Sequence, residues 1–577
     1  MGLRVCLVTP FSWSQPHSVN EHVDGVAREL RALGHHVTVL APSNRARDLA
    51  AGRQILQSGA DADLIAVGPA VPISRRSQMG VPVGARFSLD LALGEGRYDV
   101  VHGIEPGLPS ISYLALRDAQ TLAVASFFSP ERLTYPPGKA QRERLLHRTD
   151  ALLAASEHTA AAAAERFPGD YRVVSEGVDI ERFAPAQKQK VIAIEWRPSA
   201  RPVARAVLRG LRELPGWEVV FVRTRSMFGR PFVPRAVLDR VRVETLRSGE
   251  SRAELLNTSA IFVPAPQGLN RLRLEAAAAG AAIVDPPGID EQPELAAAAV
   301  ARLTEDDEHR EREGATARAW AVPQSFQSVA GELAAIYDGL ASRRRPSARS
   351  GDPLADRPWI LADLHLHTSW SHDCQIPVLD LLEHAEETGL GAVAITDHNV
   401  FGGALEAVEQ ARDRELIVIP GEEVKTDAQG EVIGLFLREE IPRGMSFVDT
   451  IAAIREQGGI VYLPHPFDRI HTVPDPATIQ RHLALIDVLE VYNARLLFET
   501  YNDEALRFAR KYGLQMGAGS DAHVLQGVGT GVLRMRAFEG PEEFMLSLRS
   551  AQVQRRPRSL LYLQSLKWAA QAKERVR

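Results

Sequence analysis

The sequence has few of the features that indicate a secreted or membrane-spanning protein. Only two cysteines, Cys6 and Cys374, occur in 577 residues, so there is no disulfide framework and a reducing compartment is favoured. No apolar run reaches about 18 residues, and the amino terminus lacks the pattern of a signal peptide. We therefore expect a cytoplasmic protein.

Lysine is also scarce. Seven lysines accompany 60 arginines, and 67 basic against 73 acidic side chains give a net charge of −6. This is not the basic excess that indicates nucleic-acid binding. With 45% hydrophobic residues, a chain of this length is expected to form several domains with substantial cores.

The carboxyl-terminal part contains an ordered series of histidines and carboxylates. Short apolar runs precede or begin each polar group, at Trp359–Ala362, Ala392–Ile395, Ile417–Ile419, Ile460–Leu463, Val488–Val491 and Gln515–Ala518. The polar groups are Asp363-Leu-His365-Leu-His367, Asp373, Asp397-His398, Glu422-Glu423, Glu431, His465 and Asp521-Ala-His523. This order is typical of a (β/α) barrel, in which the carboxyl ends of the strands meet at one mouth.

Two spacings in this series favour metal binding. Alternate residues of a strand point to the same side, so His365 and His367 can reach one ion, as can Asp521 and His523. Imidazole and carboxylate suit manganese, zinc or iron, and the donors are too many for one tetrahedral centre. The series therefore predicts a centre with several divalent ions.

Residues 358–556 resemble, through these motifs, the PHP (polymerase and histidinol phosphatase) family. Its metallophosphoesterases have a distorted (β/α)7 barrel and two or three divalent ions, here Mn, Zn or Fe. The resemblance implies His365 and His367 on one ion, Asp373, His398 and His523 on another, His465 on a third, Glu423 bridging two, and Asp521 near the first pair. It also implies that water activated by the ions hydrolyses a phosphoester, either a small-molecule phosphoester or, as alternatives, a nucleotide or a nucleic-acid end.

One position departs from the family pattern, and at a second the identity of the ligand is ambiguous. Glu431 stands where members commonly have a histidine, just before the next strand. A carboxylate still binds manganese or zinc, so Glu431 is expected as a ligand of the third ion. In Ser371-His372-Asp373, Asp373 is favoured as the ligand and His372 is the alternative.

Two arginines are candidates for a catalytic role. Arg469 and Arg495 follow the segments that end in His465 and Asn493, close to the expected mouth. A guanidinium can pair with phosphate through two hydrogen bonds. The alternative is that both are loop arginines with ion-pair partners such as Asp468.

The amino-terminal part alternates between strand and helix patterns. A strand at Leu3–Pro10, a helix at His22–Leu33 and a strand at Val37–Leu40 begin a series that continues to about residue 170. A second series covers Val191–Val300. The α/β pattern predicts two doubly wound, Rossmann-like domains ahead of the barrel.

Residues 1–340 resemble retaining glycosyltransferases of GT-B fold, in particular phosphatidylinositol mannosyltransferases. The resemblance rests on Tyr98-Asp-Val-Val-His102, Gly177-Val-Asp179 and the segment around Glu275. It implies a cleft for a nucleotide or nucleotide sugar. Glu275 would bind the ribose, and Arg197 and Arg201 would stand in for the residues that hold the donor diphosphate.

Several positions of the glycosyltransferase pattern are replaced. His17 and Ser18 occupy the place of a Gly-Gly turn that lets the backbone approach the diphosphate. Phe128 replaces a histidine of the reaction site, and Gln267 replaces the first of two glutamates. We therefore expect a degenerate module that does not transfer sugar; an active transferase with unusual donor chemistry is the alternative.

The domain boundaries follow from these patterns. We expect Rossmann-like domains at 1–182 and 183–342, the second with a closing helix at Phe326–Ser342, and a barrel at 358–556. The basic, Pro- and Ser-rich segment 343–357 reads as a solvated linker, with contact to anionic lipid or nucleic acid as the alternative. The basic tail 557–577 reads as an amphipathic helix that packs on the body or, alternatively, lies on a membrane.

Together these features predict a metal-dependent phosphoesterase fused to a degenerate glycosyltransferase-like module. One alternative is a bifunctional protein, which turnover of a nucleotide sugar would distinguish. Another is a scaffold without turnover, against which the near-complete ligand set argues.

Overall fold

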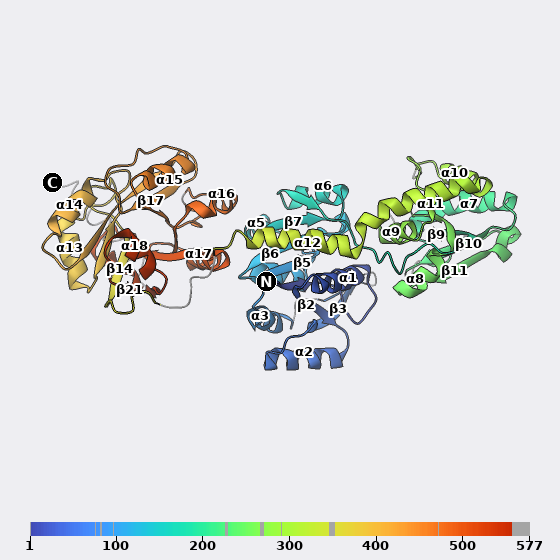
Figure 1. Cartoon of the computed structure of the whole chain (residues 1–577), viewed down its shortest axis with the longest axis horizontal. Helices are drawn as coiled ribbons and strands as arrows, with labels where there is room; N and C mark the ends of the chain where they lie inside the picture. Colours follow the sequence, from blue (N-terminus) through green and yellow to red (C-terminus); the bar gives the residue numbers. More distant parts are fainter. Residues whose placement is uncertain are drawn as a thin grey trace. The chain divides into compact units, whose positions relative to one another are not determined.

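The structure is a computed structural model that describes residues 2–74, 77–80, 84–95, 97–224, 229–265, 270–289, 291–345, 352–470 and 472–556. The chain forms two compact units, Met1–Leu340 and Ala341–Arg577 (Figure 1). Gln267, residues 346–351 of the expected linker and the whole expected tail at 557–577 lie outside the described residues.

The first unit begins with an eight-stranded sheet. Its strands are β1 (Arg4–Val8), β2 (His36–Ser43), β3 (Leu64–Ser74), β4 (Ser77–Gly80), β5 (Val100–Ile104), β6 (Leu122–Phe127), β7 (Ala151–Ala154) and β8 (Tyr171–Val173), in the order β4-β3-β2-β1-β5-β6-β7-β8. Its helices are α1 (Ser18–Ala32), α2 (Ala46–Ser58), α3 (Arg86–Glu95), α4 (Ile111–Asp118), α5 (Lys139–Arg148) and α6 (Glu157–Arg166). Helix α1 begins four residues before the expected start, because His17 Nδ1 accepts a hydrogen bond from Val19 N at 3.2 Å and caps it.

A second, five-stranded parallel sheet follows in the same unit. Its strands are β9 (Gln189–Glu195), β10 (Glu218–Arg223), β11 (Val241–Thr245), β12 (Ser259–Val263) and β13 (Ala282–Ile283), in the order β11-β10-β9-β12-β13. Its helices are α7 (Arg201–Gly210), α8 (Gly249–Leu256), α9 (Asn270–Ala278), α10 (Glu294–Glu305) and α11 (Asp307–Ala321). Helix α12 (Phe326–Ala341) returns to the first sheet, where the Tyr337 hydroxyl lies 2.6 Å from His102 Nδ1. The predicted pair of Rossmann-like domains is confirmed.

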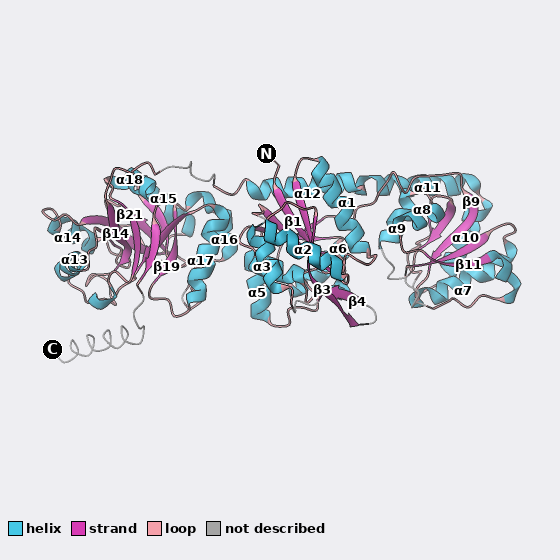
Figure 2. Ribbon diagram, turned by 90° about the horizontal axis from the view of Figure 1, so that it is seen from below, coloured by secondary structure: helices cyan, strands magenta, loops and turns pink. Residues whose placement is uncertain are grey.

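The second unit is a distorted barrel. Its strands are β14 (Trp359–Leu366), β15 (Ala392–Ile395), β16 (Ile417–Lys425), β17 (Glu431–Leu435), β18 (Ile460–Leu463), β19 (Val488–Asn493), β20 (Gln515–Gly519), β21 (Gly531–Arg536) and β22 (Gln552–Arg555), in the order β20-β19-β18-β17-β16-β15-β14-β21-β22. Its helices are α13 (Val378–Glu387), α14 (Gly402–Gln410), α15 (Phe447–Glu456), α16 (Pro476–Arg481), α17 (Glu499–Tyr512) and α18 (Gly540–Ser547). Figure 2 shows these helices flanking the strands.

Seven strands, β14 to β20, form the barrel, and β17 runs antiparallel to both of its neighbours. The seam between β14 and β20 is closed by Asp363, whose carboxylate accepts hydrogen bonds from Ser520 N and Gly529 N, each at 2.9 Å. Asp521 N also donates to His365 O at 2.8 Å. The predicted (β/α)7 barrel is confirmed.

The barrel strands are buried on both faces. Ala362 and Leu364 of β14 join an apolar core with Ala392 and Ala394 of β15. The residues between them point to the opposite face, which is how β14 supplies His365 to the mouth from inside a buried strand. No described helix is both long enough and apolar enough to cross a membrane.

Candidate metal centre

The nine residues expected as metal ligands lie together at the carboxyl end of the barrel. They come from β14 (His365) and the residue after it (His367), the following loop (Asp373), the turn after β15 (His398), β16 (Glu423), the start of β17 (Glu431), the turn after β18 (His465) and the turn after β20 (Asp521 and His523). Glu431 reaches the mouth from the first residue of its strand because β17 is antiparallel. Each other strand delivers its polar residues near its carboxyl end.

Four trios of these side chains have ligand atoms within 4.8 Å of one another among the described residues. They are His365, His367 and Asp521; His365, Glu423 and His465; His398, Glu423 and Glu431; and His367, His398 and His523. The trios share members, so adjacent ions would share ligands. This is the arrangement that a multinuclear centre requires.

Glu423 is the hub of the cluster. Its Oε2 lies 3.3 Å from His365 Nε2 and 3.1 Å from His398 Nδ1, and its Oε1 lies 3.2 Å from His465 Nε2. Burial would raise the pKa of Glu423, but the imidazoles of His365 and His398 hold it well below the ordinary value. The carboxylate is therefore ionised and faces three nitrogens that can serve as ligands.

His367 provides a test of whether the residues fit a metal ion. Its Nε2 is buried without a hydrogen bond, 3.4 Å from Asp521 Oδ1 and 3.5 Å from Glu423 Oε2. Two ligands that each stand about 2.0–2.1 Å from one zinc ion in a tetrahedron are about 3.3 Å apart. Burial lowers the pKa of His367 to about 3, which keeps the imidazole neutral as a ligand must be. The donors fit divalent ions.

The backbone is strained at two positions of the cluster. His465 and Asp521 adopt positive φ values of 26° and 52°. Residues other than glycine rarely take such values, and they concentrate where side chains must be aimed at a functional site. The fold holds these two side chains in the mouth against a local conformational preference.

Asp373, rather than His372, belongs to the cluster. Its Oδ2 lies 2.8 Å from His523 Nε2 and its Oδ1 lies 3.8 Å from His398 Nε2. The His372 side chain is exposed, with its ring centroid 5.5 Å from that of His398. Glu431 lies on the other side of the His398 ring, with its Oε1 3.7 Å from His398 Nδ1.

Glu490 of β19 is a part of the site that the sequence-based prediction missed. Its Oε1 lies 3.0 Å from His365 Nδ1 and accepts a hydrogen bond from the Tyr462 hydroxyl, also at 3.0 Å. Its Oε2 accepts from His465 N at 2.7 Å and from Asn493 Nδ2 at 3.0 Å. Contact with Glu490 leaves His365 Nε2 turned toward Glu423. The signal in the sequence was a lone glutamate inside the apolar run Val488–Val491.

Asp397 supports the cluster from behind in a similar way. It accepts hydrogen bonds from Thr368 N and from the Ser371 hydroxyl, each at 2.7 Å. The Ser371 oxygen in turn lies 3.2 Å from His367 Nδ1 and accepts from His398 N at 3.0 Å. Asp397 thereby connects the loop after His367 to the turn that carries His398.

The two arginines proposed as catalytic differ in placement. Arg495 Nη1 lies 3.1 Å from Asp521 Oδ1 and 3.3 Å from His523 Nε2, so it reaches the cluster. Burial lowers its pKa, but Asp521 and Asp373 raise it above the ordinary value, and the guanidinium is charged. Arg469 is exposed on the loop that follows His465.

In the glycosyltransferase-like unit, the glutamate expected to bind ribose is already paired. Both arginines that surround Glu275 are buried: Arg252 binds it through Nε at 2.6 Å and Nη2 at 2.8 Å, and Arg271 through Nε at 2.9 Å. Glu21 of α1 completes the network, with its Oε2 2.6 Å from Arg252 Nη2 and 3.2 Å from Arg271 Nη2. We call these four residues the Glu275 network.

Three of the replaced positions, His17, Ser18 and Phe128, also contact other parts of the protein. His17 stacks on Phe11 with ring centroids 3.6 Å apart, and Phe128 packs edge-on against His22 at 4.9 Å. Ser18 is the first residue of α1, and its carbonyl accepts a hydrogen bond from Arg271.

The two arginines expected to hold a donor are placed at the start of the second sheet's domain. Arg197 pairs with Glu195 at 2.8 Å, and Arg201 is exposed at the start of α7. Arg197 therefore already has an acidic partner.

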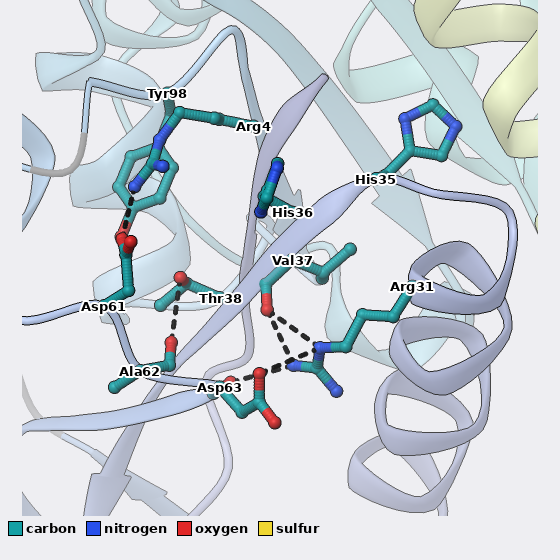
Figure 3. A pocket seen from close by; sticks show the side chains of 10 residues that line it. All are labelled: Arg4, Arg31, His35, His36, Val37, Thr38, Asp61, Ala62, Asp63 and Tyr98. Atoms are coloured by element: carbon teal, nitrogen blue, oxygen red, sulfur yellow. Dashed lines mark hydrogen bonds and ion pairs between the residues drawn. The ribbon is translucent and has the colours of Figure 1, made fainter. Parts of the chain in front are cut away.

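One cavity of about 430 Å³ lies at the end of the first sheet where strands β1, β2 and β5 begin (Figure 3). Its charged side chains pair with one another: Arg4 Nη2 lies 2.6 Å from Asp61, and Arg31 Nε lies 3.1 Å from Asp63. Within each of these pairs the two opposite charges neutralise each other. The ligand atoms of the barrel mouth instead converge on common points.

The barrel carries buried imidazoles and carboxylates at its mouth and follows two Rossmann-like domains in the chain. The protein is therefore a two-module α/β protein with a candidate metal centre. The barrel matches the family model of the PHP domain over residues 363–518 and that of the PHP-associated region over 499–553. Residues 19–182 match Glycosyltransferase Family 4. The barrel is a PHP domain, and the amino-terminal unit carries a glycosyltransferase family 4 domain.

Two curated relatives illustrate these similarities. An uncharacterized protein, MJ0417, of Methanocaldococcus jannaschii is 34% identical over 194 residues, which are 32% of this chain and 76% of that protein. The phosphatidyl-myo-inositol mannosyltransferase of Propionibacterium freudenreichii is 27% identical over 256 residues, 44% of this chain and 63% of that enzyme. Among solved structures, sucrose-phosphate synthase from Thermosynechococcus elongatus is similar over 59% of this chain and 99% of its own, at 13% identity and a TM-score of 0.43.

Proposed function

We propose that the barrel is a metal-dependent phosphoesterase that uses two or three divalent ions, manganese, zinc or iron. The observation that carries the proposal is the buried, ionised Glu423 facing the imidazoles of His365, His398 and His465. Divalent ions held there would supply activated water and neutralise charge on the transferring phosphoryl group.

The side chains of the barrel have separate tasks in this reaction. His365, His367 and Asp521 would hold one ion; Asp373, His398 and His523 would hold another. Glu490 orients His365. The charged guanidinium of Arg495, which sits against Asp521 and His523, would pair with a phosphoryl oxygen and keep the ester at the mouth. Arg469, on the loop after His465, is proposed as a second contact for phosphate.

A screen of phosphoesters tests the function. The protein is stripped of metal, resupplied with manganese, zinc or iron in separate samples, and assayed with a panel of phosphate monoesters and diesters. We expect hydrolysis that depends on the added ion, with inorganic phosphate released from a monoester and an alcohol from a diester. Arg495→Ala should lower the rate mainly through a higher KM. Failure to bind any of the three ions would reject the proposal.

The third ion is proposed to be held most weakly, because Glu431 supplies a carboxylate where an imidazole is common in the family. Burial and the neighbouring Glu423 raise the pKa of Glu431, so a proton competes with an ion for this side chain. Glu431→Ala should remove one ion and leave the others, and Glu431→His should tighten its binding by about tenfold. Elemental analysis measures both, and unchanged metal content in both variants would show that Glu431 is not a ligand.

For the amino-terminal unit we propose a non-transferring role. This is supported by Phe128, which cannot transfer a proton, and by the Glu275 network, which uses the ribose-binding carboxylate for two internal ion pairs. Incubation with nucleotide sugars and acceptor lipids should give no glycosylated product. Product that forms in the parent and disappears in Glu275→Ala would instead support a bifunctional enzyme.

A further inference from the structure

We propose that three exposed apolar side chains at the barrel mouth, Trp370, Leu497 and Phe498, bind the leaving group of the phosphoester. We call them the apolar lip. Their exposed fractions are 48%, 66% and 54%. The inference rests on the proposed function and narrows its substrate class to phosphate esters of aromatic or long-chain apolar alcohols.

The apolar lip lies on two loops that meet at one part of the candidate metal centre. Leu497 and Phe498 follow Arg495, whose guanidinium lies 3.3 Å from His523 Nε2. Trp370 precedes Asp373, whose carboxylate lies 2.8 Å from the same nitrogen. Each loop therefore contacts His523 through a charged side chain that lies two or three residues from the apolar side chains.

Two of these side chains are held in place before any ligand arrives. The Trp370 indole donates a hydrogen bond from Nε1 to Glu406 at 2.7 Å. The Phe498 ring packs edge-on against Tyr501 with centroids 5.7 Å apart. Aromatic rings fixed in this way offer apolar area while losing little conformational freedom on binding.

The pattern of charge and apolar surface matches one kind of ligand. Arg495 offers a charged guanidinium group that can bind phosphate. Leu497 begins an apolar surface two residues further along the same loop. An ester with an anionic phosphoryl group and an apolar alcohol complements both features. Covering exposed apolar side chains with such an alcohol removes their area from water, which favours binding.

The test compares two substrates in the full-length, metal-loaded protein. The variant Leu497→Ser/Phe498→Ser and the parent are assayed with 1-naphthyl phosphate and with glycerol phosphate. We expect kcat/KM for 1-naphthyl phosphate to fall about tenfold in the variant and kcat/KM for glycerol phosphate to stay unchanged. The matched control is Val448→Ser, which removes a side chain that is 42% exposed on α15 outside the mouth; it should change neither value.

The outcomes separate this inference from the proposed function. Equal losses for both esters, or no loss, would overturn the apolar lip while leaving the phosphoesterase in place. A parent that hydrolyses neither ester, nor any other phosphoester, would reject the function itself and the lip with it. A retained preference for the naphthyl ester, combined with lost binding to anionic phospholipid vesicles, would assign the three side chains to a membrane surface instead.

Discussion

Glu423 in the barrel and Glu275 in the glycosyltransferase-like unit are both fully buried carboxylates surrounded by basic side chains. The partners of Glu423 are imidazoles, which keep a lone pair when neutral and can bind a cation together with the carboxylate. The partners of Glu275 are guanidiniums, which only donate and saturate the carboxylate. A buried carboxylate therefore indicates a ligand site only when its partners retain capacity to bind something else.

The largest expected effect comes from removing an imidazole of the barrel cluster. His365→Ala should lower hydrolysis by at least about a hundredfold, since a single group that acts on the transition state contributes on this scale. The metal content should fall by at least one ion per chain, measured by elemental analysis. His384→Ala, on α13 outside the cluster, is the matched control and should keep both activity and metal.

Breaking the Glu275 network should affect stability and leave hydrolysis intact. Arg252→Met leaves the buried Glu275 with one arginine, and loss of a partner from such a buried pair costs about 3 kcal/mol. Calorimetry should show a lower Tm for the transition of the amino-terminal unit. Arg209→Ala, which removes an exposed ion pair with Glu294, should change that Tm little. Loss of phosphatase activity in Arg252→Met would contradict the separation of the two sites.

Glu490→Gln tests the carboxylate that supports the barrel cluster from behind. Replacing such an outer contact weakens metal binding by about 10- to 100-fold, because the ligand imidazole loses its fixed orientation. Titration against a chelator measures the affinity. The control is Glu422→Gln, an equally buried glutamate next to Glu423 that accepts a hydrogen bond from Ile441 N at 2.9 Å. Equal losses in the two variants would indicate a general packing effect.

The smallest expected effect is a pH dependence in the amino-terminal unit. Glu105 is buried against Arg132 at 2.9 Å, and burial raises its pKa from 4.5 to about 7. Between these values the folded state holds a proton that the unfolded state has released, so stability falls as pH rises from about 5 to 7.

Glu105→Gln should remove this fall, which amounts to about 2 kcal/mol between pH 5 and 7. The Tm of the amino-terminal unit, measured across this range, gives the slope. Identical slopes of Tm against pH in the parent and Glu105→Gln would show that Glu105 does not titrate in this pH range.

Sequence patterns were enough for the fold, and the residues that they offered as ligands lie close together in it. The strands at Ala392–Ile395 and Ile460–Leu463 have the predicted bounds, because polar residues follow each apolar run at once. Strands β14 and β16 extend beyond the predicted ends, to Leu366 and Lys425, because polar and charged residues interrupt their apolar patterns.

Partners that are distant in sequence could not be predicted. Arg252 looks like an ordinary helix arginine, and only the packing of α8 against α9 brings it to Glu275. Arg271, by contrast, lies four residues before Glu275 on the same helix, a spacing at which such pairs form. Glu490 is 125 residues from His365. The missing information is pairing in space, which neither hydrophobic periodicity nor a local motif contains.

We expect Asp363 to give the barrel seam a distinct behaviour in hydrogen exchange. The amides of Ser520 and Gly529 donate to this one carboxylate, whereas amides within the strands are protected by the strand ladder. In hydrogen exchange, separate sets of bonds open with separate free energies. The exchange rates of these two amides should therefore report the local opening of the barrel mouth, separately from the unfolding of the sheet.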